Sequence, residues 1–343
     1  MKISVETNLD KFSCGEWADV QRQSPTATIF QTYAWHQAWW QSFEKDKSLF
    51  LVCAKTDHLL GVLPLMIVKK GRLRILKFIG TGQADYCDFL YPSDNSAVLR
   101  ELLGFLFSQA SQWDAIALDN IPSDSASVPI LRDVCKKFRF PLRRYAQIGV
   151  PVLDFGSEEG FAKAVNKGSL KRHYKYFSQR PGYEVRHLTL AKDIGPLLNS
   201  FFQQHIDRRR LSGDRSLFDS DEMKNFYSNL VRGLENHQGL IFSVVQSEGK
   251  VIAFHFGFVY RKKFLWYKPS FDARLAKHSP GEVLLRELLV YAHSQGLDEF
   301  DFSIGEEPFK RRFSNVLRRN DSFKVFKSVI PSGLDLMISF FKR

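Results

Sequence analysis

The sequence predicts an α+β protein built from two tandem units, each a mixed, mostly antiparallel sheet flanked by helices. Three elements predict this fold because each of them occurs twice in the same order: a hairpin of apolar strands, an amphipathic helix, and a short strand after that helix. The chain has 343 residues, which is enough for two domains of ordinary size. We therefore expect one structural unit to be duplicated along the chain.

The two hairpins are predicted at residues 49–70 and 241–263. Each contains two runs rich in β-branched, aromatic and other apolar residues, which is typical of buried strands. The runs are separated by turns at Thr56–His58 and at Ser247–Lys250.

The two helices are predicted at VLRELLGFLFSQ (98–109) and LLRELLVYAHSQ (284–295), which share the string LRELL and the final Ser-Gln. Their apolar residues recur at spacings of three and four, the period of a helix. Strand-like runs follow at 115–121 and 299–305. The repeated order predicts a first domain at 1–150, a second at 151–330 and a basic amphipathic tail at 331–343. The tail is expected to pack as a terminal helix or to touch a membrane surface weakly.

The charge is uneven along the chain. The net charge is +12, of which residues 1–150 contribute +3 and residues 151–343 contribute +9. The second half should therefore attract a polyanionic partner, such as CoA, a nucleotide-linked sugar, tRNA or an anionic membrane.

The sequence predicts no metal site, because its four cysteines are widely spaced and no H-x-x-x-H cluster occurs. No apolar stretch approaches the ~20 residues that span a membrane, and the N-terminus lacks a secretory pattern. We therefore expect a cytoplasmic protein.

Four stretches resemble one family of acyltransferases: FQTYAWHQAWWQSF from Phe30, FIGTGQADYCDFLYP from Phe78, YKPSFDARLAKHSPGEVLLRELL from Tyr267, and IGEEPFKRRF from Ile304. They are similar to the GNAT-like CelD/BcsL acyltransferases of bacterial exopolysaccharide biosynthesis, which in turn resemble the FemAB peptidyltransferases. The resemblance covers residues 28–320 and implies tandem GNAT-like units. We expect an acyl-donor site in the second unit only, because the matching turn of the first unit, at 93–96, has neither a glycine nor a basic residue.

The predicted donor site is the start of the second repeated helix: His278, Ser279, Pro280, Gly281 and Glu282. Proline suits a first helical turn, and a preceding serine can cap its N–H groups. A helix start suits a phosphate, and in GNAT enzymes the CoA pyrophosphate binds there through a glycine-rich loop. This sequence keeps only Gly281 of that loop and adds the acidic Glu282.

The predicted catalytic residues are Lys310, Glu306, Asp301 and Tyr267. Acyl transfer needs a base for the nucleophile and positive charge for the developing oxyanion. The resemblance to FemAB proteins implies the second role for Lys310, in the pair Phe309-Lys310. Asp301 and Glu306 are alternative bases, and Tyr267 is a proton donor or an aromatic core residue. Alternatively, the basic run at 310–312 binds a phosphate or pairs with the neighbouring glutamates.

The predicted substrate-side residues are Asp85, Tyr86 and Asp88 after a glycine-bearing turn, and His205 and Arg209 on one helical face. The acids could hold a sugar or amine, or could simply cap the turn. His205 could equally be structural.

A basic and aromatic run at 167–177 fits either RNA binding or an amphipathic helix. The leading hypothesis is an acyltransferase that uses acetyl-CoA or another acyl-CoA. Its acceptor would be a hydroxyl or amine of a saccharide or other small metabolite, linked to exopolysaccharide or cell-envelope biosynthesis. The alternatives are aminoacyl transfer from tRNA and a non-catalytic subunit of a polysaccharide-synthesis complex.

Overall fold

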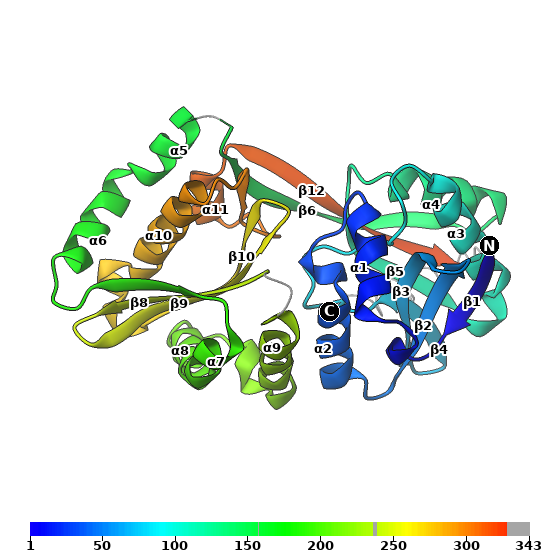
Figure 1. The fold of residues 1–343 in the computed structure, drawn as a ribbon, viewed down its shortest axis with the longest axis horizontal. Coiled ribbons are helices and arrows are strands. Elements are labelled where there is room, and N and C mark those ends of the chain that lie inside the picture. The colour runs from blue at the N-terminus through cyan, green and yellow to red at the C-terminus, as the bar shows by residue number, and fades with distance from the viewer. Residues whose placement is uncertain (157, 236–238, 328–343) are drawn as a thin grey trace. The chain divides into compact units, whose positions relative to one another are not determined.

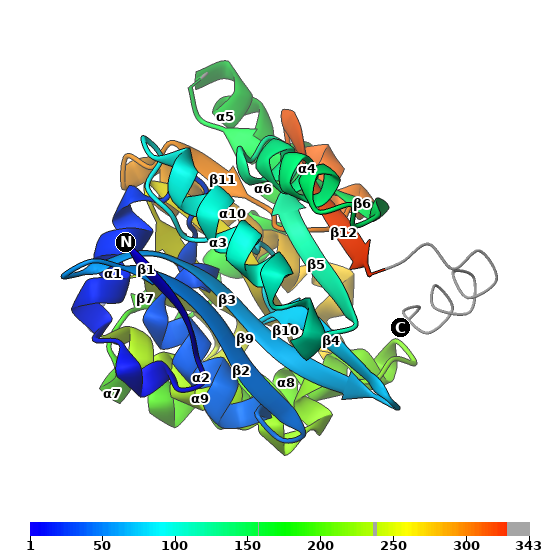
Figure 2. The ribbon, with the colours of Figure 1, turned by 90° about the vertical axis from the view of Figure 1, so that its right-hand side faces the viewer.

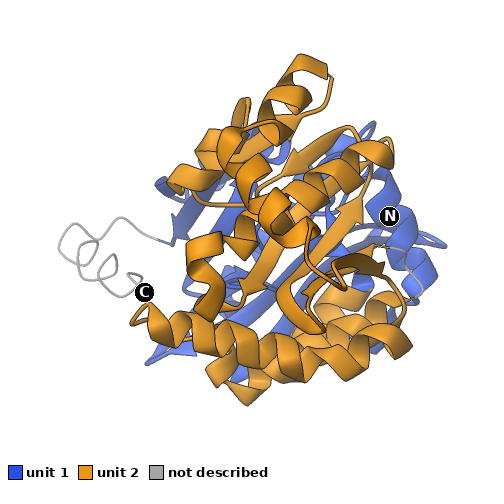
Figure 3. Cartoon of the chain, turned by 90° about the vertical axis from the view of Figure 1, so that its left-hand side faces the viewer, with its two compact units in different colours: residues 1–33, 44–147, 319–343 blue, residues 34–43, 148–318 orange. Residues whose placement is uncertain are grey.

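The computed structural model describes residues 1–156, 158–235 and 239–327 (Figure 1). The chain divides into two compact units (Figure 3). Unit 1 comprises residues 1–33, 44–147 and the segment from 319, and unit 2 comprises residues 34–43 and 148–318. The predicted ranges 1–150 and 151–330 differ from these units mainly at 34–43 and at 319–327. The predicted tail at 331–343 lies outside the described residues.

The strands of unit 1 follow the order β1-β2-β3-β4-β5-β12. Neighbouring strands are antiparallel except β4 and β5, which are parallel. The C-terminal strand belongs to this sheet because Asn320–Phe326 pair with Ala115–Pro122 of β5. The bounds are β1 (Lys2–Glu6), β2 (Lys47–Lys55), β3 (Leu59–Lys70), β4 (Leu73–Phe78), β5 (Ala115–Pro122) and β12 (Val316–Phe326).

Unit 1 contains the first of the two predicted helices, α3 (Ser96–Ser108), which packs against β2 and β3 (Figure 2). The leucines whose spacing predicted this helix are buried. Gly61 of β3 permits the close packing, because a Cβ there would lie 2.9 Å from a methyl carbon of Val98. The other helices are α1 (Cys14–Gln23) and α4 (Ser127–Lys137), with short 3-10 turns at Leu9–Lys11, Ile29–Gln31 and Ala110–Gln112.

The strands of unit 2 follow the order β7-β8-β9-β10-β11-β6, and only β10 and β11 are parallel neighbours. The strand β6 contributes residues to both units, and its Val152–Asp154 pair with β11. The bounds are β6 (Leu142–Asp154), β7 (Glu184–Leu188), β8 (Leu240–Ser247), β9 (Lys250–Tyr260), β10 (Lys263–Phe271) and β11 (Glu299–Asp301). Both units thus have four antiparallel strands, one parallel strand and one further antiparallel strand, which confirms the duplicated fold.

Helices cover both faces of the unit 2 sheet (Figure 1). One face, with Phe264 and Trp266, packs against α10. The other face contacts α8 and α9, where the ring centroids of Phe201 and Phe254 lie 5.9 Å apart and those of Tyr227 and Phe256 lie 4.9 Å apart. The bounds are α5 (Glu158–Val165), α6 (Gly168–Ser178), α7 (Ala191–Ile194), α8 (Leu198–Leu211), α9 (Asp221–Leu234), α10 (Pro280–Ser294) and α11 (Pro308–Phe313), with 3-10 turns at Gly195–Leu197, Leu217–Asp219 and Ala273–His278.

The aromatic helix α2 (Tyr33–Phe43) lies inside the predicted first domain at 1–150, and the structure corrects this placement. Its residues 34–43 belong to unit 2. The physical reason is aromatic packing, because the ring of Trp35 lies 5.2 Å from that of Phe226 on α9 and 5.8 Å from that of Phe258 on β9. Within the described residues, no helix is both long and apolar enough to span a membrane.

Candidate active site

The candidate site of unit 2 begins where two parallel strands stop pairing. β10 pairs with β11 only through Lys263–Leu265. Beyond Leu265, the register of β10 against β9 shifts, which marks a β-bulge at Trp266 and Tyr267. Bulges often occur beside active sites, where they redirect side chains and end strand pairing. The pairing of β10 with β11 therefore ends at Asp301, the last residue of β11.

The loop after β11 is fixed by main-chain hydrogen bonds. The N–H groups of Phe302 and Gly305 donate to the carbonyl oxygens of Pro151 and Gly149, at 3.0 and 2.9 Å. Asp301 is buried, and its Oδ1 accepts the N–H of Ser303 at 2.7 Å. The predicted base therefore supports the turn that leads out of β11.

Lys310 is a buried ammonium at the end of this loop. Lys310 lies on the short helix α11, which has six residues, and only 6% of its surface is exposed. Its Nζ donates to the carbonyl oxygen of Ile304 at 2.6 Å and lies 3.0 Å from Oε2 of Glu307. An ammonium has three N–H donors, so these acceptors account for two of them. Gly305 gives it room, because a Cβ there would lie 2.6 Å from Glu307 Oε2 and 3.2 Å from Nζ.

The glutamates beside Lys310 form two ion pairs, as the alternative interpretation of the basic run expected. Glu307 pairs with Lys310, and Glu306 pairs with Arg311 at 2.8 Å. Glu306 and Arg311 are exposed, and the side chain of Glu306 crosses Gly149, where a Cβ would lie 2.2 Å from its Oε1. The predicted base Glu306 is thus engaged with Arg311. Glu307 was not among the predicted site residues, although its i,i+3 spacing from Lys310 is a sequence signal.

Tyr267 lies in an aromatic core. Its ring is 5.4 Å from that of Phe258 and 6.2 Å from that of Tyr227. Its backbone N–H, within the bulge, donates to Nε2 of His255 at 3.2 Å. His255 is fully buried, and burial lowers its pKa to about 3, so the imidazole is neutral. Sequence reasoning missed His255, whose signal is a polar residue inside an apolar strand.

The start of α10 holds the predicted donor residues. Ser279 directly precedes α10 and has a φ of 50°. Its side chain makes no capping hydrogen bond, so the expected serine cap is absent. His278 stacks on Tyr176 with ring centroids 3.6 Å apart. Burial and nearby positive charges lower the pKa of His278. A Cβ on Gly281 would lie 3.0 Å from a ring carbon of Phe271, so this glycine serves packing within the unit.

This helix start does not fit the pyrophosphate of CoA. Pro280 has no N–H, and the N–H groups of Glu282 and Val283 already donate to the carbonyl oxygen of Ser279, at 3.0 and 3.3 Å. The first turn also carries the carboxylate of Glu282, which pairs with Arg312 at 2.9 Å. A diphosphate would therefore meet few N–H donors and a like charge.

His205 and Arg209 lie one turn apart on α8 but have different partners. His205 is buried, its Nδ1 lies 2.8 Å from Oγ of Ser216, and burial together with Arg208 lowers its pKa to about 3. Arg209 pairs instead with Asp214 at 3.2 Å, where both side chains are exposed. These contacts suit structural roles, and a substrate role for either residue stays a prediction.

Asp85, Tyr86 and Asp88 lie in unit 1, within a loop held by hydrogen bonds. The carbonyl oxygens of Asp85 and Tyr86 accept side-chain N–H groups of Asn320 and Gln31, at 3.0 and 2.8 Å. Asp88 is 1% exposed and accepts the hydroxyl groups of Thr26 and Ser125, and burial raises its pKa. These contacts are those of a structural turn. A role in binding substrate stays a prediction.

No group of three or more His, Cys, Asp or Glu side chains in the described part of the chain could hold a metal ion.

Comparison with known proteins identifies the fold. Residues 165–311 match the model of the family described as "Acetyltransferase (GNAT) domain". The chain has the GNAT fold. A comparison with the curated proteins returned no match.

Solved structures extend the likeness over both units. The crystal structure of FemX is 12% identical, with 98% of this chain and 100% of that chain covered and a TM-score of 0.67. A tandem GNAT protein from the clavulanic acid biosynthesis pathway is 11% identical, covers 94% of this chain and 97% of its own, and has a TM-score of 0.53. The L-PGS structure from Bacillus licheniformis is 11% identical, with 96% and 95% covered and a TM-score of 0.57. At these identities the likeness shows the fold alone. It confirms the predicted tandem GNAT-like architecture.

Proposed function

We propose that unit 2 is an acyltransferase in which the ammonium of Lys310 stabilises the charge that develops on the acyl carbonyl oxygen. The observation that supports this role is the buried ammonium of Lys310, which Ile304 and Glu307 hold beside the end of β11. A preorganised donor in a site of low dielectric constant stabilises an oxyanion without reorganising during the reaction. The match of residues 165–311 to an acetyltransferase domain supports the reaction class.

In the proposed reaction, an amine or hydroxyl of the acceptor attacks the acyl carbonyl carbon. A new C–N or C–O bond forms, the bond to the carrier breaks, and the nucleophile's proton passes to the leaving atom of the carrier. Lys310 donates a hydrogen bond to the carbonyl oxygen while that oxygen carries negative charge. Asp301 remains the proposed base because it is a buried carboxylate where β11 ends.

We propose tRNA as the carrier of the acyl group, as the FemAB resemblance implies. The supporting observation is the outer face of α6, where Lys171, Arg172 and Lys175 are exposed. Within the described residues none of the three has a carboxylate partner. Nucleic acids bind such faces through their phosphates and release counterions. The poor fit of a pyrophosphate at the start of α10 points in the same direction.

Acyl-CoA is the second candidate donor, because the matched family is an acetyltransferase domain. Under either candidate we propose a small-molecule or saccharide acceptor, linked to exopolysaccharide or cell-envelope biosynthesis. The two candidates differ in the donor that unit 2 binds: aminoacylated tRNA in the first and acyl-CoA in the second.

Binding of aminoacylated tRNA and of acetyl-CoA by the full chain tests the donor. We expect tRNA binding to weaken with salt and acetyl-CoA to give no calorimetric signal. Binding of tRNA should weaken with salt along a line of log binding constant against log salt concentration. The variant Lys171→Ala/Arg172→Ala/Lys175→Ala should lower the magnitude of that slope by about one for each phosphate that is no longer neutralised. The control Lys69→Ala/Lys70→Ala/Arg72→Ala removes three cations from the end of β3 and the turn that follows it, and it should not lower this slope. Saturable binding of acetyl-CoA without binding of tRNA would select the second candidate. Release of the acyl group from neither donor would favour the non-catalytic hypothesis.

A further inference from the structure

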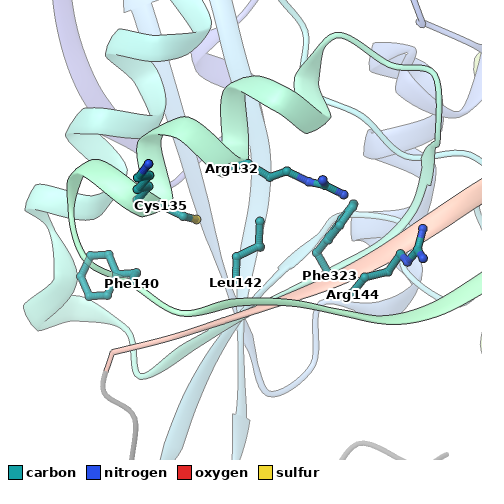
Figure 4. A pocket seen from close by; sticks show the side chains of 7 residues that line it. Arg132, Cys135, Phe140, Leu142, Arg144 and Phe323 are labelled. Atoms are coloured by element: carbon teal, nitrogen blue, oxygen red, sulfur yellow. The ribbon is translucent and has the colours of Figure 1, made fainter.

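Unit 1 contains a pocket that the proposed acyl transfer does not use. It lies between α4 and the strands β6 and β12 and has a volume of about 340 Å³ (Figure 4). Pockets that bind small molecules commonly start at about 300 Å³. All of its lining residues belong to unit 1: Arg132, Cys135, Lys136, Phe140, Leu142, Arg144 and Phe323.

The lining combines positive charge with an apolar floor. Arg132 and Lys136 are exposed and lie four residues apart, on one face of α4. Neither has a carboxylate partner in the described part of the chain. Figure 4 shows Arg132 extending from α4 towards Arg144 and Phe323. Two uncompensated cations therefore border an apolar surface.

The remaining polar groups suit binding rather than covalent chemistry. Arg144 pairs with Asp321 at 3.3 Å, and Gln147 donates to the same carboxylate oxygen at 2.8 Å, so this arginine is held in place at the rim. Cys135 is buried, and burial raises the pKa of its thiol to about 12, so the thiol stays protonated. A protonated thiol is a poor nucleophile and behaves as a small apolar group.

We propose that this pocket binds an organic phosphate whose remaining part is apolar or aromatic. Arg132 would form two parallel hydrogen bonds with phosphate oxygens, and Lys136 would act as a point charge. Phe140, Leu142 and Phe323 would contact the apolar part. A lipid phosphate and a soluble nucleotide share this chemistry. The site lies in unit 1 and is independent of the reaction proposed for unit 2.

Calorimetric titration of the full chain with decyl phosphate, AMP and inorganic phosphate tests the proposal. Decyl phosphate is used below its micellar concentration. We expect at least one of the two organic phosphates to bind at least about tenfold more tightly than inorganic phosphate, because it also buries apolar surface. The organic phosphate that binds more tightly identifies the source as lipid-like or nucleotide-like.

Variants separate the two parts of the pocket. Arg132→Ala/Lys136→Ala should weaken binding of the tighter organic phosphate by about tenfold or more, since the phosphate then has neither cation to pair with. The control Lys137→Ala/Arg143→Ala removes the same charge from neighbouring positions outside the pocket and should leave binding unchanged. Leu142→Ala should weaken binding of the organic phosphate and spare that of inorganic phosphate. Equal binding of all three probes, or unchanged binding by the Arg132/Lys136 variant, would overturn the proposal.

Discussion

The strand that leads to the candidate active site depends on one buried carboxylate. β11 has only three residues, and its first residue, Glu299, is 5% exposed. Arg318 donates two hydrogen bonds to its carboxylate, at 2.7 and 2.6 Å, and Lys263 lies 3.0 Å away. Replacing Arg318 by alanine would leave this carboxylate paired with Lys263.

The expected cost of Arg318→Ala follows from burial. Hydrogen bonds to charged groups are worth about 1.5–3 kcal/mol each, and breaking a fully buried ion pair costs about 3–5 kcal/mol. The side chain of Arg318 is 38% exposed and that of Lys263 is 49% exposed, so water screens part of the interaction. We expect a loss of about 2–3 kcal/mol in the free energy of unfolding. Lys263→Ala should cost about 1 kcal/mol or less.

Urea unfolding at pH 7 measures both losses. The control is Arg311→Ala, which breaks the exposed pair with Glu306 and should cost less than about 1 kcal/mol. A loss for Arg318→Ala no larger than that of the control would mean that water replaces the arginine and that Glu299 does not depend on it.

The same carboxylate gives a pH dependence of known sign. Burial raises the pKa of Glu299, but the hydrogen bonds from Arg318 and the charge of Lys263 outweigh it, so the pKa is lowered. A lowered pKa contributes stability above the ordinary value of 4.5, and that contribution is lost as the pH falls through the folded value. The stability difference between the wild type and Glu299→Gln should therefore shrink as the pH falls below 4.5.

Three further predictions concern buried groups. Gly257→Ala should lower the free energy of urea unfolding by about 1–3 kcal/mol, because its Cβ would lie 2.0 Å from Cε1 of His255. The pKa of Asp88 is raised, so its contribution to stability should decline as the pH rises above 3.8, and Asp88→Asn should flatten this decline in unfolding curves from pH 4 to 7. In the native protein only Cys14 among the four cysteines should react promptly with a thiol reagent, because the others are buried: Cys53, Cys87 and Cys135.

Each of these predictions has its own control. Gly104→Ala on α3 should be tolerated, because the nearest atoms lie 3.9 Å from its Cβ. Equal effects of the two glycine variants would contradict the packing around His255. An unchanged pH profile for Asp88→Asn would show that Asp88 ionises normally. Prompt labelling of native Cys14→Ser would show that the other thiols are accessible.

The duplicated fold was predictable from the sequence because its signals are local. Strand and helix periods, two similar helices and their flanking strands determine the order of elements within each unit. The assignment of residues 34–43 to unit 2 and of the segment from 319 to unit 1 was not predictable. Whether α2 packs in unit 1 or unit 2 depends on the partners of Trp35, and the place of β12 depends on its pairing with β5. Such contacts are distant in sequence and leave no periodic pattern.

The candidate site was predictable only in part. The pair Phe309-Lys310 drew attention to Lys310, but its burial depends on Gly305 and on the carbonyl oxygen of Ile304. Ser279 satisfies the sequence rule for a helix cap, yet its left-handed backbone conformation leaves its side chain without that bond. His255 could not be predicted as the acceptor of a bulge N–H, because the bulge itself carries no clear sequence signal.

The role of Lys310 can be measured as release of the acyl group from its donor in a single turnover, because water can replace an unknown acceptor. Wild-type protein is compared with Lys310→Ala and with the neighbouring control Arg311→Ala, after unfolding curves show that all three are folded. The account predicts that Lys310→Ala slows deacylation by about 10²–10³-fold while the control stays close to the wild type. A rate for Lys310→Ala equal to that of the control would contradict the assignment of Lys310 as the group that stabilises the oxyanion.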